Sequence, residues 1–208
     1  LKSMGSEIDF IGDRKILIQG KENLRGTTHH VIPDRIEAGT YMIAGALIGN
    51  NLKILNIEPD HMQNILNVFE ELKIDFKLNK DSVSLSKSDI EMGVNLQTEE
   101  YPGFPTDLQA QTMVLLSKSK KQSSIIENIF ENRFMHVPEL NRMGAQISIK
   151  GNKSIISPSS ELIGAPVMAT DLRASVSLVL AGLISKGETI INRIYHIDRG
   201  YEEIEKKI

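Results

Sequence analysis

The sequence predicts an α/β fold built from repeats of helix and strand. Three stretches begin a helix in the same way, with an aspartate that follows proline or threonine, at Asp34, Asp107 and Asp171. Each is followed by about four turns rich in Ala, Leu, Ile, Val and Met. A β-branched run then ends in asparagine 22, 21 and 21 residues after the aspartate, at positions 56, 128 and 192. A spacing kept three times indicates repeated units, each burying its apolar face against its neighbours.

Hydrophobic periodicity predicts the elements of the first unit. Apolar residues at 65, 68, 69 and 72 recur at helical spacing, and the segments 75–78 and 82–85 alternate with the period of two that is typical of strands. We therefore expect the order helix, strand, helix, strand, strand: a helix from Asp34, a strand at 52–57, a helix at about 59–72, and strands at 75–78 and 82–85.

The other two units repeat this order. The second predicts a helix from Asp107 to about 117, a strand at 123–129, a helix at 136–143, and strands at 146–150 and 154–157. The third predicts a helix from Asp171, a strand at 188–194, and a helix from Gly200 to the last residue.

The first 26 residues match the end of a repeat rather than its beginning. A helix tail, strands at 7–11 and 15–19, and a hinge at Gly12 and Asp13 parallel the later segment 140–164. We expect two parts: residues 1–32, with the end of one repeat and a link, and residues 34–208. Both ends then lie inside repeats, which predicts a piece of a longer protein.

Composition excludes several classes of protein. The 208 residues carry a formal net charge of −3 and a pI near 6.0, which argues against broad nucleic-acid binding. The longest apolar run, 176–184, is far shorter than the roughly 20 residues of a membrane span, so we expect a cytoplasmic protein. No cysteine is present, and the five histidines lack metal-ligand spacing. We expect no metal site.

The helix opening at Thr106 and Asp107 is the first candidate for chemistry. Thr106 and Gln109 fit a capping box, in which a hydroxyl and an amide satisfy the first backbone N–H groups of the helix. Asp107 would then stand at the positive end of the helix with a free carboxylate, as a base or a ligand. The alternative is that Asp107 is one more residue that starts a helix well.

Arginines near the other helix openings are candidate anion ligands. Arg173 follows Asp171 in a first turn, where a positive charge opposes the helix dipole. An anion at the helix N-terminus would offset this, or Arg173 pairs with Asp171 or faces solvent. Arg199 lies between a strand end and a helix start, a common ligand position in α/β folds, and its alternative is also a surface arginine.

Four blocks of sequence resemble the UDP-N-acetylglucosamine enolpyruvyl transferases, and the resemblance covers essentially the whole chain. They are Tyr-Pro-Gly-Phe-Pro-Thr-Asp-Leu-Gln-Ala-Gln at 101–111, Ile-Phe-Glu-Asn-Arg-Phe-Met-His at 129–136, Met-Ala-Thr-Asp-Leu-Arg-Ala-Ser at 168–175, and Arg-Ile-Tyr-His-Ile-Asp-Arg-Gly-Tyr at 193–201. The resemblance implies two lobes, each an inside-out α/β barrel of three repeats. The lobes close around the substrates, which bind between them.

The resemblance also implies a reaction. Phosphoenolpyruvate gives its enolpyruvyl group to the 3′-hydroxyl of UDP-N-acetylglucosamine and releases phosphate, the first committed step of peptidoglycan synthesis, with no cofactor. By matching motifs, Asp107 takes the proton of the attacking hydroxyl, and Ile129 contacts the UDP-sugar. Asp171 and Arg173 are active-site groups, and Arg199 binds the phosphoenolpyruvate anion.

One departure from the family pattern is large. The mobile cysteine loop that supplies an acid is absent, so the partner of this chain would be the cysteine-bearing lobe of the same protein, to which residues 1–32 in part belong. Alone, the chain should not turn over. Two other hypotheses remain: a non-catalytic repeat module that binds a protein partner, and a lobe of the shikimate-type enolpyruvyl transferase.

Overall fold

The computed structural model describes residues 1–12, 14–159 and 161–208. The chain divides into two compact units, Leu1–Ile32 and Pro33–Ile208. Within the described residues, no helix is long and apolar enough to cross a membrane.

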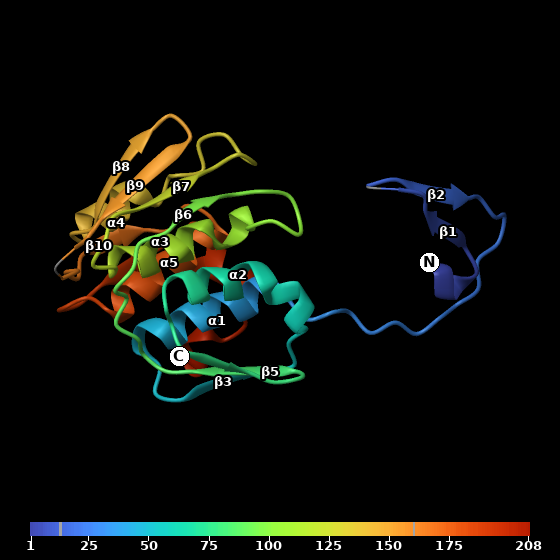
Figure 1. The fold of residues 1–208 in the computed structure, drawn as a ribbon, viewed down its shortest axis with the longest axis horizontal. Helices are drawn as coiled ribbons and strands as arrows, with labels where there is room; N and C mark the ends of the chain where they lie inside the picture. The colour runs from blue at the N-terminus through green and yellow to red at the C-terminus, as the bar shows by residue number, and fades with distance from the viewer. Residues whose placement is uncertain (13, 160) are drawn as a thin grey trace. The chain divides into compact units, whose positions relative to one another are not determined.

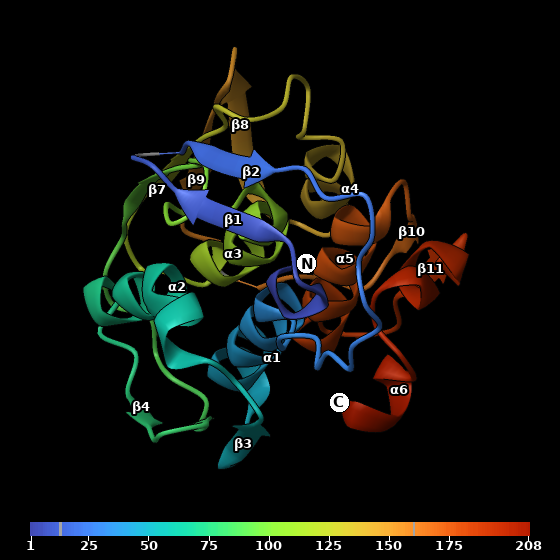
Figure 2. The ribbon, with the colours of Figure 1, turned by 90° about the vertical axis from the view of Figure 1, so that its right-hand side faces the viewer.

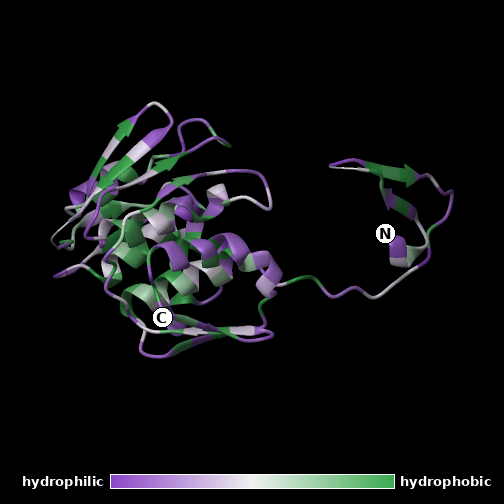
Figure 3. Cartoon of the chain, viewed as in Figure 1, coloured by the Kyte–Doolittle hydropathy of each residue, from purple (hydrophilic) through white to green (hydrophobic). Residues whose placement is uncertain are grey.

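The first unit is a 3₁₀-helix followed by a β-hairpin. Helix η1 (Lys2–Met4) precedes strands β1 (Glu7–Phe10) and β2 (Ile16–Gln19), which pair antiparallel. Apolar side chains of the hairpin are exposed, among them Phe10 and Ile18, and β2 consists mostly of hydrophobic residues (Figure 3). The expected hinge at Gly12 and Asp13 lies partly outside the described residues, because Asp13 is not among them.

Three helices form the centre of the second unit, and its sheets lie outside them (Figures 1 and 2). These helices are α1 (Arg35–Ile48), α3 (Gln109–Ser117) and α5 (Leu172–Leu183), and α3 packs against both of the others. Every residue of α3 is buried. A helix that is apolar on most faces belongs in a core, which explains why small and apolar residues dominate all three.

The remaining elements surround these helices. Helix α2 (Pro59–Glu71) buries one face, with Ile65 and Phe69 inside, and turns its polar face outward (Figure 3). The other helices are η2 (Thr106–Leu108), α4 (Val137–Arg142), η3 (Ile194–Arg199) and α6 (Ile204–Lys207).

Three small sheets cover the core. The first has the order β3-β5-β4 and the second β6-β7-β9-β8, while β10 pairs with β11. Their bounds are β3 (Leu52–Leu55), β4 (Phe76–Leu78), β5 (Ser82–Leu85), β6 (Asn95–Gln97), β7 (Ser123–Ile126), β8 (Gln146–Lys150), β9 (Lys153–Ser157), β10 (Pro166–Met168) and β11 (Ile190–Asn192). Helices inside and sheets outside is the expected inside-out arrangement, but the described sheets do not close into a barrel.

The repeat analysis predicted most elements and missed three. The long helices, the second helices of the first two full units and the hairpins lie where they were expected. Strands β5 and β8 match their predicted bounds, β9 begins one residue earlier, and the other predicted strands are one to four residues shorter. Strands β6 and β10 and helix η3 were not predicted, and α6 begins at Ile204 rather than at Gly200. Both missed strands run parallel to the predicted strand beside them, β7 and β11.

Candidate active site

Two arginines hold the carboxylate of Asp107. Arg133 donates from Nη2 to Oδ1 at 2.7 Å, and Arg173 donates from Nη2 to Oδ2 at 3.4 Å. The Asp107 side chain remains 38% exposed, against 25% and 14% for the two arginines. Because a carboxylate can accept about four hydrogen bonds, Asp107 can still accept a proton from a group that reaches it from solvent.

Thr106 does not form the predicted capping box with Gln109. Its hydroxyl donates to Oε2 of Glu127 at 2.9 Å and accepts from Nη1 of Arg133 at 2.8 Å. No side chain caps η2, and Gln109 instead donates to the backbone oxygen of Arg133 at 3.5 Å. The capping prediction was wrong because the Thr106 hydroxyl and the Gln109 amide have other partners, Glu127 and Arg133, on a later loop.

The three equivalent aspartates differ in what their carboxylates do. Asp34 accepts from the backbone nitrogens of Ile36 and Glu37, at 2.7 and 3.2 Å, and so caps α1. Asp171 caps α5 in the same way, accepting from Arg173 N and Ala174 N, both at 2.9 Å. Asp107 caps no helix, and its carboxylate instead accepts hydrogen bonds from two arginine side chains.

Arg173 does not pair with Asp171 or extend into solvent. Its guanidinium reaches Asp107 and also donates from Nη1 to the hydroxyl of Tyr201 at 3.1 Å. The predicted unfavourable position of Arg173 in a first helical turn is therefore offset by Asp107, a carboxylate of the neighbouring repeat.

Buried polar side chains of Tyr201, Thr40 and Gln111 form a hydrogen-bond network that contacts Arg173. The Tyr201 side chain is 1% exposed, and its hydroxyl lies 2.9 Å from Oγ1 of Thr40 on α1. Gln111 on α3 donates from Nε2 to Thr40 Oγ1, to the Tyr201 hydroxyl and to the backbone oxygen of Asp107. Side chains from α1, α3 and the segment after η3 thus converge under the Asp107 site.

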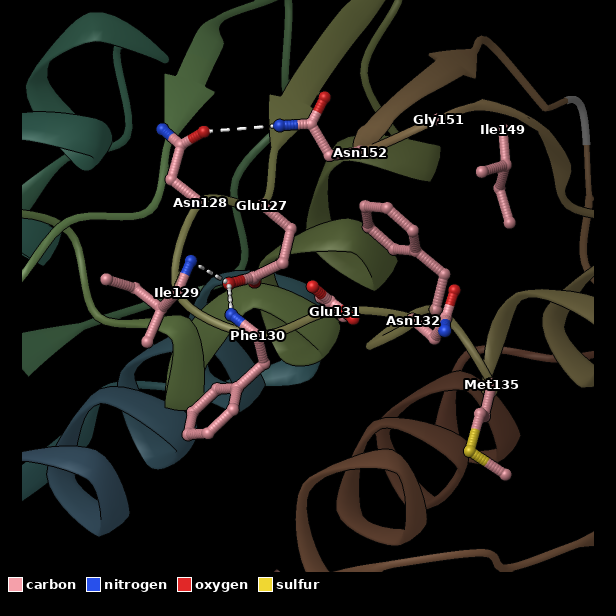
Figure 4. A pocket seen from close by; sticks show the side chains of 11 residues that line it. Glu127, Asn128, Ile129, Phe130, Glu131, Asn132, Met135, Ile149, Gly151 and Asn152 are labelled. Carbon is pink, nitrogen blue, oxygen red and sulfur yellow. Dashed lines mark hydrogen bonds between the residues drawn. The ribbon is translucent and has the colours of Figure 1, made fainter.

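Glu127 organises the loop that carries Ile129. Its Oε1 accepts from the backbone nitrogens of Ile129 and Phe130, at 2.9 and 3.1 Å (Figure 4). The same oxygen accepts from the hydroxyl of Thr98 at 2.8 Å. This loop borders a pocket of ≈ 760 Å³, whose lining residues are Glu127, Asn128, Ile129, Phe130, Glu131, Asn132, Phe134, Met135, Ile149, Gly151 and Asn152. Ile129 therefore lies at a concave surface, and hydrogen bonds link its loop to Asp107 through Glu127, Thr106 and Arg133.

Arg199 is set apart from this network. It is the exposed last residue of η3, two positions before the buried Tyr201. Among the described residues, hydrogen bonds link Asp107, Arg173 and the loop of Ile129, and Arg199 takes no part in them. Its exposed guanidinium remains open to an anion from solvent.

His136 lies buried behind the site. Burial lowers its pKa to about 4, the Asp171 carboxylate opposes this shift, and Arg133 adds to it. Its Nε2 atom has no hydrogen-bond partner in the described structure. The lowered pKa keeps the His136 imidazole neutral at neutral pH. No group of three or more His, Cys, Asp or Glu side chains in the described residues could hold a metal.

Sequence reasoning did not assign roles to Arg133, Glu127 and Tyr201. Arg133 and Tyr201 stand inside the quoted blocks 129–136 and 193–201, and Glu127 directly precedes the asparagine that ends the second repeated strand. A charged residue at the end of an apolar strand was the signal available for Glu127, since a buried carboxylate requires donors.

The whole chain, residues 1–208, matches the family described as EPSP synthase (3-phosphoshikimate 1-carboxyvinyltransferase). The chain belongs to this enolpyruvyl transferase family. A solved enolpyruvyl transferase, NikO from Streptomyces tendae, has the same fold, with a TM-score of 0.90, 25% identity, and 99% of this chain and 49% of that chain covered.

The relatives with higher sequence identity belong to one group of enolpyruvyl transferases. Proteins named UDP-N-acetylglucosamine 1-carboxyvinyltransferase from Pelagibacter ubique and Gluconacetobacter diazotrophicus are 52% and 50% identical over all of this chain. An EPSP synthase structure from Acinetobacter baumannii is 18% identical over 78% of the chain, with a TM-score of 0.57, and shares the fold alone. The chain spans about half the length of the curated relatives it matches. The predicted resemblance is confirmed.

Proposed function

We propose that this chain is the greater part of one lobe of an enzyme that transfers enolpyruvyl from phosphoenolpyruvate to the 3′-hydroxyl of UDP-N-acetylglucosamine. The observation that carries the proposal is the carboxylate of Asp107, which caps no helix and is held between two arginines while still reachable from solvent. Relatives about 50% identical over the whole chain have the matching name.

Asp107 is the general base of the proposed reaction. As the sugar oxygen bonds to the substituted carbon of phosphoenolpyruvate, its proton must leave, and a carboxylate within hydrogen-bond reach accepts it. The two arginines keep the carboxylate in one orientation, which limits the reorganisation needed during the transfer. Their positive charges also stabilise negative charge that develops nearby.

The anionic substrates have candidate ligands on the same lobe. We propose that Arg199 binds phosphoenolpyruvate, since an exposed guanidinium suits a carboxylate or phosphate. Ile129 contacts the UDP-sugar from the loop that Glu127 holds, and Asp171 positions Arg173 by capping α5. The sequence resemblance supports these assignments.

The rest of the active site lies on a partner lobe of the same protein. We propose that this lobe supplies the acid, that no cofactor, nucleic acid or membrane takes part, and that the enzyme acts in the cytoplasm. The absence of cysteine from these 208 residues supports an acid from elsewhere in the protein.

Matched substitutions at two equivalent aspartates test the proposal in the full-length protein. Asp107→Ala should lower kcat by about 10²–10⁴-fold. Asp34→Ala, at the equivalent position of the first repeat, should instead lower the stability by ~1 kcal/mol, because it removes a cap, and should retain kcat. Unchanged turnover in Asp107→Ala would favour the non-catalytic module instead.

The acceptor is tested separately. Phosphate release from phosphoenolpyruvate should require UDP-N-acetylglucosamine in the full-length protein. Release that requires shikimate 3-phosphate would instead support the shikimate-type enzyme and contradict the proposed acceptor.

A further inference from the structure

Glu127 is a buried carboxylate whose partners divide between its two oxygens. The residue is 3% exposed. Oε1 accepts from Thr98 Oγ1 and from two consecutive backbone nitrogens, those of Ile129 and Phe130 (Figure 4). Oε2 accepts from the hydroxyl of Thr106, at 2.9 Å. One oxygen therefore fixes a loop, and the other contacts the residue next to Asp107.

The loop side is held by three successive backbone groups. Besides the two nitrogens on Oε1, the backbone nitrogen of Asn128 donates to Thr98 Oγ1 at 2.9 Å. Thr98 and Glu127 together satisfy the N–H groups of residues 128–130, a stretch without regular secondary structure. These hydrogen bonds are partly buried, so losing either partner would leave their N–H groups without the acceptors that hold the loop in place.

The other side is a directed chain of hydrogen bonds. A carboxylate can only accept, so Thr106 must give its single proton to Glu127. The lone pairs of Thr106 then face Arg133, which donates to them from Nη1 at 2.8 Å and to Asp107 from Nη2 at 2.7 Å. The charge on Glu127 thereby determines which way Thr106 points, and so where Arg133 holds Asp107.

A purely structural role would not require this charge. Among the described residues, no basic side chain forms an ion pair with Glu127, so burying the carboxylate is offset only by neutral donors. A neutral glutamine could hold the loop through one oxygen, but its amide would be a donor facing Thr106.

We propose that Glu127 is a positioning residue that couples the sugar-nucleotide loop at Ile129 and Phe130 to the orientation of Asp107. This inference rests on the proposed function. The two carboxylate oxygens of Glu127 have separable effects. The contacts of Oε1 act on binding of the acceptor, and the contact of Oε2 acts on the chemical step.

Three isosteric variants of the full-length protein test this separation. Thr98→Val, on the Oε1 side, should raise KM for UDP-N-acetylglucosamine about ten-fold and leave kcat within about two-fold. Thr106→Val should lower kcat about ten-fold and leave this KM within about two-fold. Glu127→Gln should resemble Thr106→Val, because its single oxygen faces the three donors on the loop side.

Thermal unfolding and the wild-type enzyme supply the controls. A merely structural Glu127 would give both threonine variants the same pattern, with kcat falling alongside the unfolding midpoint and KM unchanged, and this would overturn the coupling. Turnover that Asp107→Ala leaves at the wild-type rate would overturn the proposed function instead. Failure of the two proposals is therefore distinguishable.

Discussion

Arg133 and Asp107 are joined at 2.7 Å, while the other amino group of Arg133 donates to Thr106 beside it. One planar guanidinium therefore spans two consecutive residues of η2 and fixes the carboxylate relative to the turn. The Arg133 guanidinium carbon also lies 4.9 Å from the ring centre of Phe130. The two hydrogen bonds and the Phe130 ring together restrict the position of the Arg133 guanidinium. A flexible lysine ammonium could not reproduce this geometry.

Arg133→Lys should lower kcat of the full-length protein by about ten-fold or more. Lysine keeps the charge but cannot donate to Thr106 and Asp107 in the same fixed geometry. Steady-state phosphate release measures the effect. Arg142→Lys is the control, because Arg142 is an exposed residue paired with Glu139 at 3.5 Å. Equal activity of the two variants would contradict a role for the guanidinium fork.

The Tyr201 hydroxyl should contribute to stability, whereas the Tyr41 hydroxyl should not. Tyr201→Phe removes a buried group bonded to Thr40 and Arg173, with an expected loss of ~1–3 kcal/mol. Tyr41 has a buried hydroxyl without a partner in the described structure, so Tyr41→Phe should be neutral or slightly stabilising. Denaturant unfolding of the two variants measures the difference, and equal losses would contradict the network.

The central helices were predictable because local sequence and tertiary structure agree there. Asp34 and Asp171 begin helices as caps, and each helix is apolar on nearly all faces, which fits a core position. Strands β6 and β10 were not predictable in this way. Each has three residues, too few to display a period of two. Its strand character comes from pairing with β7, 29 residues away, or with β11, 24 residues away.

The candidate site was predictable only as a set of separate residues. Helix-opening chemistry identified Asp107 and the unusual Arg173 as candidates, although the capping box that was expected to leave Asp107 free is not formed. Their pairing could not, since the two residues lie 66 positions apart and meet only when α3 packs on α5. Thr106 was assigned to a local cap for the same reason: its actual partners, Glu127 and Arg133, lie on a later loop.

The isolated 208 residues should release no phosphate from phosphoenolpyruvate in the presence of UDP-N-acetylglucosamine. The chain spans about half of its relatives, and it contains no cysteine for the acid of the family's mobile loop. A phosphate-release assay checks this, with the full-length protein as the positive control. Sustained turnover by the isolated chain would show that one lobe suffices and would contradict the two-lobe proposal.

His136 should make the stability of the protein depend on pH between about 4 and 6.5. Burial lowers its pKa in the folded state to about 4, below the ordinary value of 6.5. In this window the unfolded chain binds more protons than the folded chain. The contribution of His136 to the free energy of unfolding is therefore fully present above pH 6.5 and is lost as the pH decreases. The loss approaches roughly 3 kcal/mol near the lower limit.

A substitution separates this effect from general acid denaturation. His136→Leu removes the titrating group. As the pH falls from 7 toward 4, the unfolding midpoint of the wild type should therefore decrease more than that of the variant. Thermal unfolding of the full-length proteins across this range measures it. Asp171 and Arg133 act on the imidazole with opposite signs, so burial sets the direction. A constant difference across the range would show that the wild-type imidazole is not held neutral by burial.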